Sequence, residues 1–77
     1  MKDWLSNYCT VGEITEHFEP VKNGAKIIVH YTNPTSEFQH ALTRIRTVAK
    51  LICVVNDTTI QLVAPTKSLL LDRIKEL

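Results

Sequence analysis

Residues 51–64 read LICVVNDTTIQLVA, and this stretch decides the fold. Two runs rich in apolar and β-branched residues flank the pair Asn56-Asp57. Both residues of that pair tolerate the positive φ that a two-residue hairpin turn requires. The stretch therefore predicts two antiparallel strands, over residues 51–55 and 58–64, that are joined by a tight turn.

The register of this hairpin places Val55 opposite Thr58 and Cys53 opposite Ile60, on a mostly apolar face with Leu51 and Leu62. The opposite face carries Ile52, Val54, Thr59, Gln61 and Val63. Because the first strand is apolar on both faces, it has the composition of a strand buried on both sides. We therefore expect residues 51–55 in the middle of the sheet.

A helix is predicted directly before the hairpin, over residues 35–48. Its apolar positions recur at three- and four-residue spacing and are Phe38, Ala41, Leu42, Ile45 and Val48 or Ala49. Asn33 before a first-turn proline, or Ser36 with Gln39 three residues on, are its candidate N-caps. The helix is long enough to connect a strand at 27–31 to the strand at 51–55, which makes these strands parallel if they are neighbours.

A second helix is predicted after the hairpin. Pro65 ends the strand, and Thr66 is the expected N-cap of a helix that continues to about Glu76. Leu70 and Ile74 lie on one stripe of this helix with Leu77. Since eleven residues do not form a stable helix alone, this helix must pack on the sheet.

The first third of the chain allows two interpretations. Val11, Ile14 and Phe18 have helical spacing after a capping-box pattern at residues 10–13, as in the opening of a helix-turn-helix. Against this, Asn23-Gly24 is a strong hairpin signal, and it precedes a predicted strand from Lys26 to Tyr31. The hairpin pairs Phe18 with Val29, Pro20 with Ile27 and His17 with His30, and it gathers the apolar residues on one face. We favour a strand over residues 12–21.

The chain as a whole predicts a single α+β domain over residues 1–77, because two halves of this length would be too small to bury cores. The expected order is a short N-terminal helix followed by β-β-α-β-β-α. The architecture is a small two-layer sandwich, in which a four-stranded mixed sheet carries the helices mainly on one face.

Composition excludes several classes of protein. The formal net charge is +1, and no run approaches the roughly 18 apolar residues of a membrane span. Cys9 and Cys53 are the two cysteines, and we expect reduced thiols and a cytoplasmic protein. The chain lacks a glycine-rich phosphate loop and a paired nucleophile and base, so we expect no enzyme and no cofactor. His17 and His30 alone do not make a metal site.

Basic residues form one candidate binding surface. His40, Arg44, Arg46 and Lys50 occupy the polar side of the central helix, where no acid follows Glu37, and Lys22 and Lys26 flank the Asn23-Gly24 turn. A solvated helix face is the most common fate of such charges. The alternatives are contacts with nucleic-acid phosphates or with an acidic protein surface.

The outer face of the sheet forms a second candidate surface. Its apolar residues are Val21, Ile28, Ile52, Val54 and Val63. Trp4, Leu5 and Tyr8 of the N-terminal helix can cover them within the chain, and a second copy or another protein can do so instead. Trp4, Tyr8, Ile28 and Val63 are the interface candidates.

These patterns predict a non-catalytic protein-binding module, such as a small regulator, inhibitor or assembly factor. Its partner is another protein, and a homodimer is a further option. The alternative function is a nucleic-acid-binding regulator that uses Arg44, Arg46 and Lys50, which the net charge of +1 makes the weaker interpretation.

Overall fold

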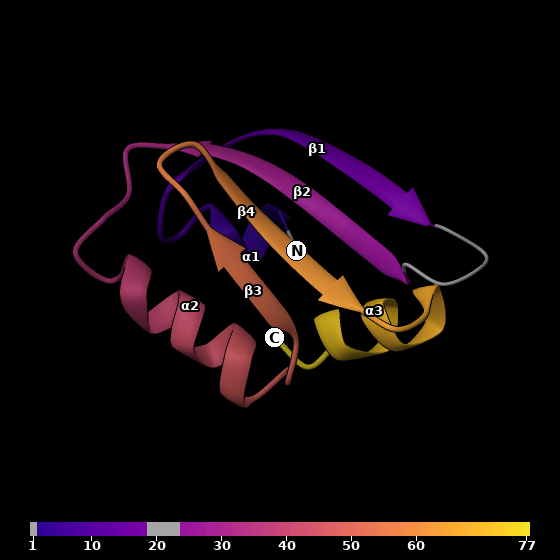
Figure 1. Ribbon diagram of the computed structural model, residues 1–77. Helices are drawn as coiled ribbons and strands as arrows, with labels where there is room; N and C mark the ends of the chain where they lie inside the picture. The colour runs from indigo at the N-terminus through magenta and orange to yellow at the C-terminus, as the bar shows by residue number, and fades with distance from the viewer. Residues whose placement is uncertain (1, 19–23) are drawn as a thin grey trace.

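The computed structural model describes residues 2–18 and 24–77, and it has the predicted order of elements (Figure 1). The elements are α1 (Lys2–Leu5), β1 (Thr10–Phe18), β2 (Ala25–Thr32), α2 (Phe38–Thr47), β3 (Ile52–Val55), β4 (Thr59–Ala64) and α3 (Lys67–Ile74). The chain is therefore an α+β fold in which a short helix precedes β-β-α-β-β-α. Its Cα radius of gyration is 11.8 Å, close to the roughly 11.5 Å expected for a compact domain of this length.

The four strands form one antiparallel sheet in the order β1-β2-β4-β3. The predicted mixed sheet is wrong, because β4 lies between β2 and β3. Both of those strands run antiparallel to β4, so they share a direction without being neighbours. Helix α2 thus connects two strands that are separated by the width of a third.

Strand β3 lies at the edge of the sheet, and the prediction that it lies in the middle is wrong. Its side chains alternate between the core and solvent. Cys53 is buried, whereas Ile52 and Val54 are exposed. The two central positions belong to β2 and β4, and the residues of β4 alternate between fully buried and half-buried.

The β3–β4 hairpin turns one residue later than predicted. The Asn56 backbone N–H donates to the Thr59 carbonyl at 3.0 Å, and the Asn56 side-chain oxygen accepts from the backbone N–H groups of Thr58 and Thr59. Asn56 is thus the first residue of the turn, and its side chain stabilises the turn. As a result, Cys53 pairs with Leu62 instead of Ile60. A shift of two residues leaves every side chain on its predicted face.

The N-terminal hairpin confirms a strand over residues 12–18, and β1 begins at Thr10. Its register is wrong by four residues, since Phe18 pairs with Ala25 instead of Val29. Gly24, directly before the first residue of β2, has a φ of 69° and lies against the backbone carbonyls of Ala64 and Pro65. The predicted roles of Pro20, Val21, Lys22 and Asn23 lie outside the described residues.

A β-bulge interrupts β1 between Val11 and Ile14. Gly12 lies within it, and a Cβ built on Gly12 would be 3.3 Å from the His30 carbonyl oxygen. The close approach of the two backbones explains a glycine inside a strand.

The core lies between the sheet and the helices. α2 and α3 lie on the same side of the sheet (Figure 1). Leu42 of α2 and Leu70 of α3 share one buried cluster with Ile60 and Leu62 of β4. The Tyr31 ring stacks on Phe38 with centroids 4.8 Å apart, which fixes β2 against the start of α2.

The helix ends agree with the predictions only in part. The Thr66 hydroxyl accepts from the Leu69 N–H at 3.2 Å, as expected of an N-cap of α3. Helix α2 instead begins after Glu37, and neither Asn33 nor Ser36 caps it. Asn33 has a φ of 51°, so the chain turns there before the helix begins.

Helix α1 packs on the core side of the sheet and does not cover the outer face. Leu5 is fully buried in the core cluster, and the half-buried Trp4 and Tyr8 pack against that cluster. The Tyr8 carbonyl accepts from the Thr35 N–H at 2.8 Å, which ties α1 to the segment before α2. Trp4 and Tyr8 therefore do not cover the outer face, and their interface role stays a prediction. No helix in the described ranges is long and apolar enough to cross a bilayer.

Candidate functional site

Four apolar side chains lie together on the face of the sheet away from the helices. We call Ile28, Ile52, Val54 and Val63 the open-face patch. Ile52 pairs directly with Val63, and Gln61 separates Val54 from Ile28. Ile52 is 63% exposed and Val54 52% exposed, whereas Ile28 and Val63 are half-buried. The patch is therefore most accessible along β3.

On one side, β3 pairs with no other strand of the residues that the structure describes. Two backbone hydrogen bonds fix which residues of β4 bond to each neighbouring strand: the Tyr31 N–H donates to the Thr58 carbonyl, and the Asn56 N–H donates to the Thr59 carbonyl. By the alternation of an antiparallel ladder, Ile52 and Val54 bond to β4, and Cys53 and Val55 direct their backbone groups to the free edge. The side chains of Ile52 and Val54 lie beside this edge, and an edge strand of this kind presents backbone groups that are not paired within the sheet.

Arg46 of α2 contacts the same edge of the sheet. Its Nη2 donates to the Cys53 carbonyl oxygen at 3.0 Å. A guanidinium has five N–H donors, so this one bond leaves most of them available. Within residues 2–18 and 24–77, no carboxylate lies at ion-pair distance from Arg46.

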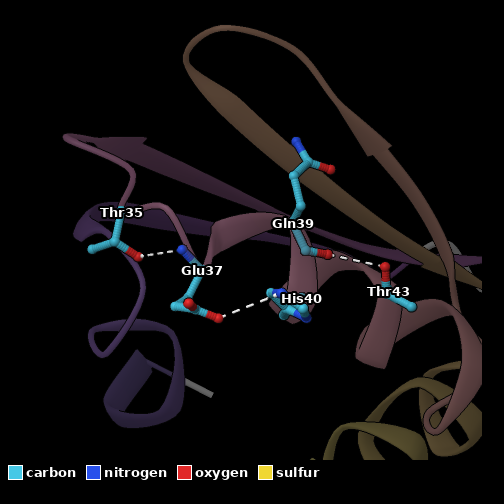
Figure 2. Close-up of polar contacts among 5 residues, drawn as sticks. All are labelled: Thr35, Glu37, Gln39, His40 and Thr43. Atoms are coloured by element: carbon cyan, nitrogen blue, oxygen red, sulfur yellow. Dashed lines mark hydrogen bonds and ion pairs between the residues drawn. The ribbon is translucent and has the colours of Figure 1, made fainter.

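The predicted basic surface of α2 is divided between two sides of the helix. Residues two apart on a helix differ by about 200° in direction, so Arg44 and Arg46 cannot face the same partner. Arg46 faces β3, and His40 lies with Arg44 on the other side. Figure 2 shows His40 beside Glu37, with His40 Nε2 3.5 Å from Glu37 Oε2, while Gln39 points in a different direction. Both members of that pair are largely exposed.

The remaining predicted basic residues are dispersed. Lys50 follows α2 and precedes β3, and its backbone carbonyl accepts from Arg73 Nη1 at 2.9 Å. Lys26 lies on the open face of β2, paired with His17 on one side and Val63 on the other. Lys22 lies outside the described residues.

The histidines of the first hairpin do not form the predicted pair. His17 is opposite Lys26, and His30 lies beside the β1 bulge, close to Gly12. The four-residue change of register separates them. No cluster of three or more metal-ligating side chains occurs in the part of the chain that the structure describes.

Both cysteines are free and buried. Burial raises the pKa of the Cys9 thiol, whose Sγ lies 3.6 Å from the Leu5 carbonyl oxygen. Burial also raises the pKa of the Cys53 thiol, and the nearby Arg46 guanidinium opposes that rise. Burial and a raised pKa are typical of cysteine side chains that pack in a core.

A small depression of about 180 Å³ lies at the bulge end of the sheet. Its lining residues are Thr10, Gly12, His30, Tyr31, Thr32 and Thr58. Pockets that bind cofactors or drug-sized ligands usually enclose about 300–1,000 Å³. The depression is therefore smaller than a typical small-molecule site.

Comparisons of the chain with models of protein families, with curated proteins and with solved structures found no match. The candidate site is thus defined by its geometry. Sequence reasoning identified all four residues of the open-face patch on the outer face but missed the edge position of β3 and the contact of Arg46 with it. The available signal was length, since β3 is shorter than β4 and short strands favour sheet edges.

Proposed function

We propose that this chain is a non-catalytic protein-binding module that acts through the open-face patch and the free edge of β3. One observation carries the proposal. Strand β3 has the composition of a strand buried on both faces, yet it lies at the edge with Ile52 and Val54 exposed. Contiguous apolar exposure beside free backbone groups is typical of an interaction surface.

The energetic gain from covering this surface is substantial for a small domain. Complete burial of a valine or isoleucine side chain contributes about 1.5–3 kcal/mol, so covering Ile52 and Val54 contributes about half of that for each. Every 1.4 kcal/mol changes a dissociation constant by a factor of about ten. The two side chains therefore supply a meaningful part of the affinity for a partner.

The charge around the patch supports an occupant of a particular chemistry. Lys26 is the one charged side chain among the open-face residues that pair across the described strands, and Arg46 lies at the β3 edge. A partner that presents apolar side chains together with carboxylates matches both features.

Nucleic acid is the less supported partner. The basic residues that were predicted to form a single ridge on α2 are divided between two sides, and Lys26 lies on the sheet. Binding to phosphates by a continuous row of cations requires those side chains on one surface.

A capture experiment with matched variants tests the proposed function. Tagged wild-type chain, Val54→Lys and Arg44→Glu are each incubated with lysate from the source cells, and captured proteins are quantified. We expect captured proteins to be lost with Val54→Lys and retained with Arg44→Glu, because only the first change places a charge in the open-face patch. Equal capture by all three chains would contradict the proposal.

A titration with single-stranded and duplex nucleic acid at two salt concentrations distinguishes the protein-binding module from the alternative, a nucleic-acid-binding regulator. We expect no salt-dependent binding. Tight binding that weakens steeply with salt and is abolished by Arg44→Glu would favour a nucleic-acid-binding regulator instead.

A further inference from the structure

We propose that the β3 edge binds an extended segment of another protein by strand addition, and that this segment alternates apolar with acidic side chains. The inference rests on the proposed function and specifies its partner. The carboxylates of the segment lie beside the part of β3 that contains Cys53, where Arg46 and Lys50 are located.

The backbone of β3 is the first part of the argument. Cys53 and Val55 direct their N–H and C=O groups away from β4, and an added strand would bond to them. Arg46 already occupies the Cys53 carbonyl oxygen at 3.0 Å. A carbonyl oxygen has two lone pairs, so it can accept from an added strand while it keeps the bond from Arg46.

The side chains determine the pattern of the added segment. On the open face, its residues continue the rows that contain Ile52 and Val54, so apolar residues fit there. On the other face, alternate residues lie over the side of α2 that carries Arg46. A carboxylate at that position completes an ion pair with a guanidinium that has no acidic partner among the described residues.

The charges along β3 also give a direction. Lys50 precedes the strand, whereas Asp57 follows it. In an antiparallel arrangement, the C-terminal half of the added segment lies beside Cys53 and Lys50. The acidic residues therefore belong in that half, and an acid near Asp57 would be repelled.

A second copy of this chain fits the edge less well. Its β3, with the sequence ICVV, contains no acid. Pairing two copies through β3 would also bring a second Arg46 to the same region without a carboxylate for either. Charge complementarity therefore favours a different, acidic partner.

A synthetic peptide of about eight residues, within the usual length of a strand, tests the inference. Valine alternates with threonine in its first half and with glutamate in its second half, and both ends are blocked. One control peptide has lysine in place of glutamate, and another has glutamate in the first half. Binding to the ¹⁵N-labelled chain is followed by changes in backbone amide resonances.

We expect the glutamate peptide to bind more tightly than both controls, with the largest changes at Cys53 and Val55. Arg46→Gln should weaken binding about tenfold, as for loss of a charge-assisted contact. Arg44→Gln is the matched control on the other side of α2 and should leave binding unchanged. Arg46→Glu should reverse the preference to the lysine peptide, provided that its spectrum shows a folded protein.

Two edge variants test the role of the backbone. Val55→Pro removes an N–H from the free edge of β3, whereas Glu16→Pro does the same at the free edge of β1. We expect only Val55→Pro to abolish peptide binding.

Equal binding of the glutamate and lysine peptides, or changes centred on β1, would overturn the inference. So would a stable dimer in which Arg46→Gln strengthens association, because the edge would then bind a second copy. Failure of peptide binding together with loss of protein capture by Val54→Lys would overturn strand addition and leave the proposed function standing. If capture also survives Val54→Lys, both proposals fail.

Discussion

The two edge strands of the sheet, β1 and β3, differ in how readily another strand can pair with them. β1 carries a bulge, and the exposed Glu16 directs its backbone to the free side. Bulges and charges of this kind discourage pairing with another chain. β3 carries neither, and Ile52 and Val54 are exposed beside its free backbone. One edge is therefore protected from strand addition, and the other is suited to it.

Apolar residues also have different environments in β4 and in β3. In β4, such residues on the core side hold the fold together. In β3, Cys53 is buried in the core, whereas Ile52 and Val54 are largely exposed to solvent. Apolar composition alone does not distinguish stability from binding.

The largest expected effect on stability comes from a substitution in β4, the strand that pairs with β3. Leu62→Ala removes a fully buried side chain opposite Cys53 and should lower the free energy of unfolding by about 3 kcal/mol. Ile52→Ala removes a similar volume at the edge and should cost less than about 1 kcal/mol. Urea unfolding of the two variants measures the contrast, and similar losses would mean that Ile52 has a structural role.

The next effect concerns the turn that sets the register of β3. Asn56→Ala removes an oxygen that accepts from Thr58 and Thr59, and it should cost about 1–2 kcal/mol. Asp57→Ala, the neighbouring change, is the matched control and should have little effect. Thermal unfolding compares them, and an unaffected Asn56→Ala would show that the side-chain bonds do not fix the turn.

A smaller effect is expected at the bulge of β1. Gly12→Ala places a Cβ 3.3 Å from the His30 carbonyl, so the strands must separate slightly, at a cost of about 1 kcal/mol. Glu13→Ala, in the same bulge, should be nearly neutral. Chemical denaturation provides the comparison. A stabilising Gly12→Ala would show that the bulge adjusts without strain.

The smallest effect is expected at the exposed pair on α2. His40→Ala removes its contact with Glu37 and should change the free energy of unfolding by less than about 0.5 kcal/mol. Protein capture should also be unchanged, because His40 lies away from β3. A loss of capture would instead place the binding surface on that side of α2.

Local sequence patterns predicted the helices and strands well, but they predicted poorly which strands are neighbours in the sheet. Thr66 marked the start of α3, and the period of two in residues 59–64 marked β4. The faces of both hairpins survived register errors because each error was an even number of residues. Sheet order depends on contacts between distant residues, and the composition of β3 favoured the wrong position.

The candidate site was predictable only as side chains on a face. Ile28 and Val63 followed from alternation within their strands. Arg44 and Arg46 were placed on adjacent stripes of one exposed face, although residues two apart on a helix differ by about 200° in direction. To predict the hydrogen bond from Arg46 to Cys53, one must know that β3 lies at the edge of the sheet, and no local sequence pattern indicates this.

Hydrogen–deuterium exchange of the edge amides, with and without the glutamate peptide, tests the central claim most directly. The amides that face outward are Cys53 and Val55 on β3, and Ile14, Glu16 and Phe18 on β1. We predict that the peptide slows exchange at Cys53 and Val55 and leaves the β1 amides unchanged. Protection on β1, or no protection at Val55 when the peptide is saturating, would contradict recognition at the β3 edge.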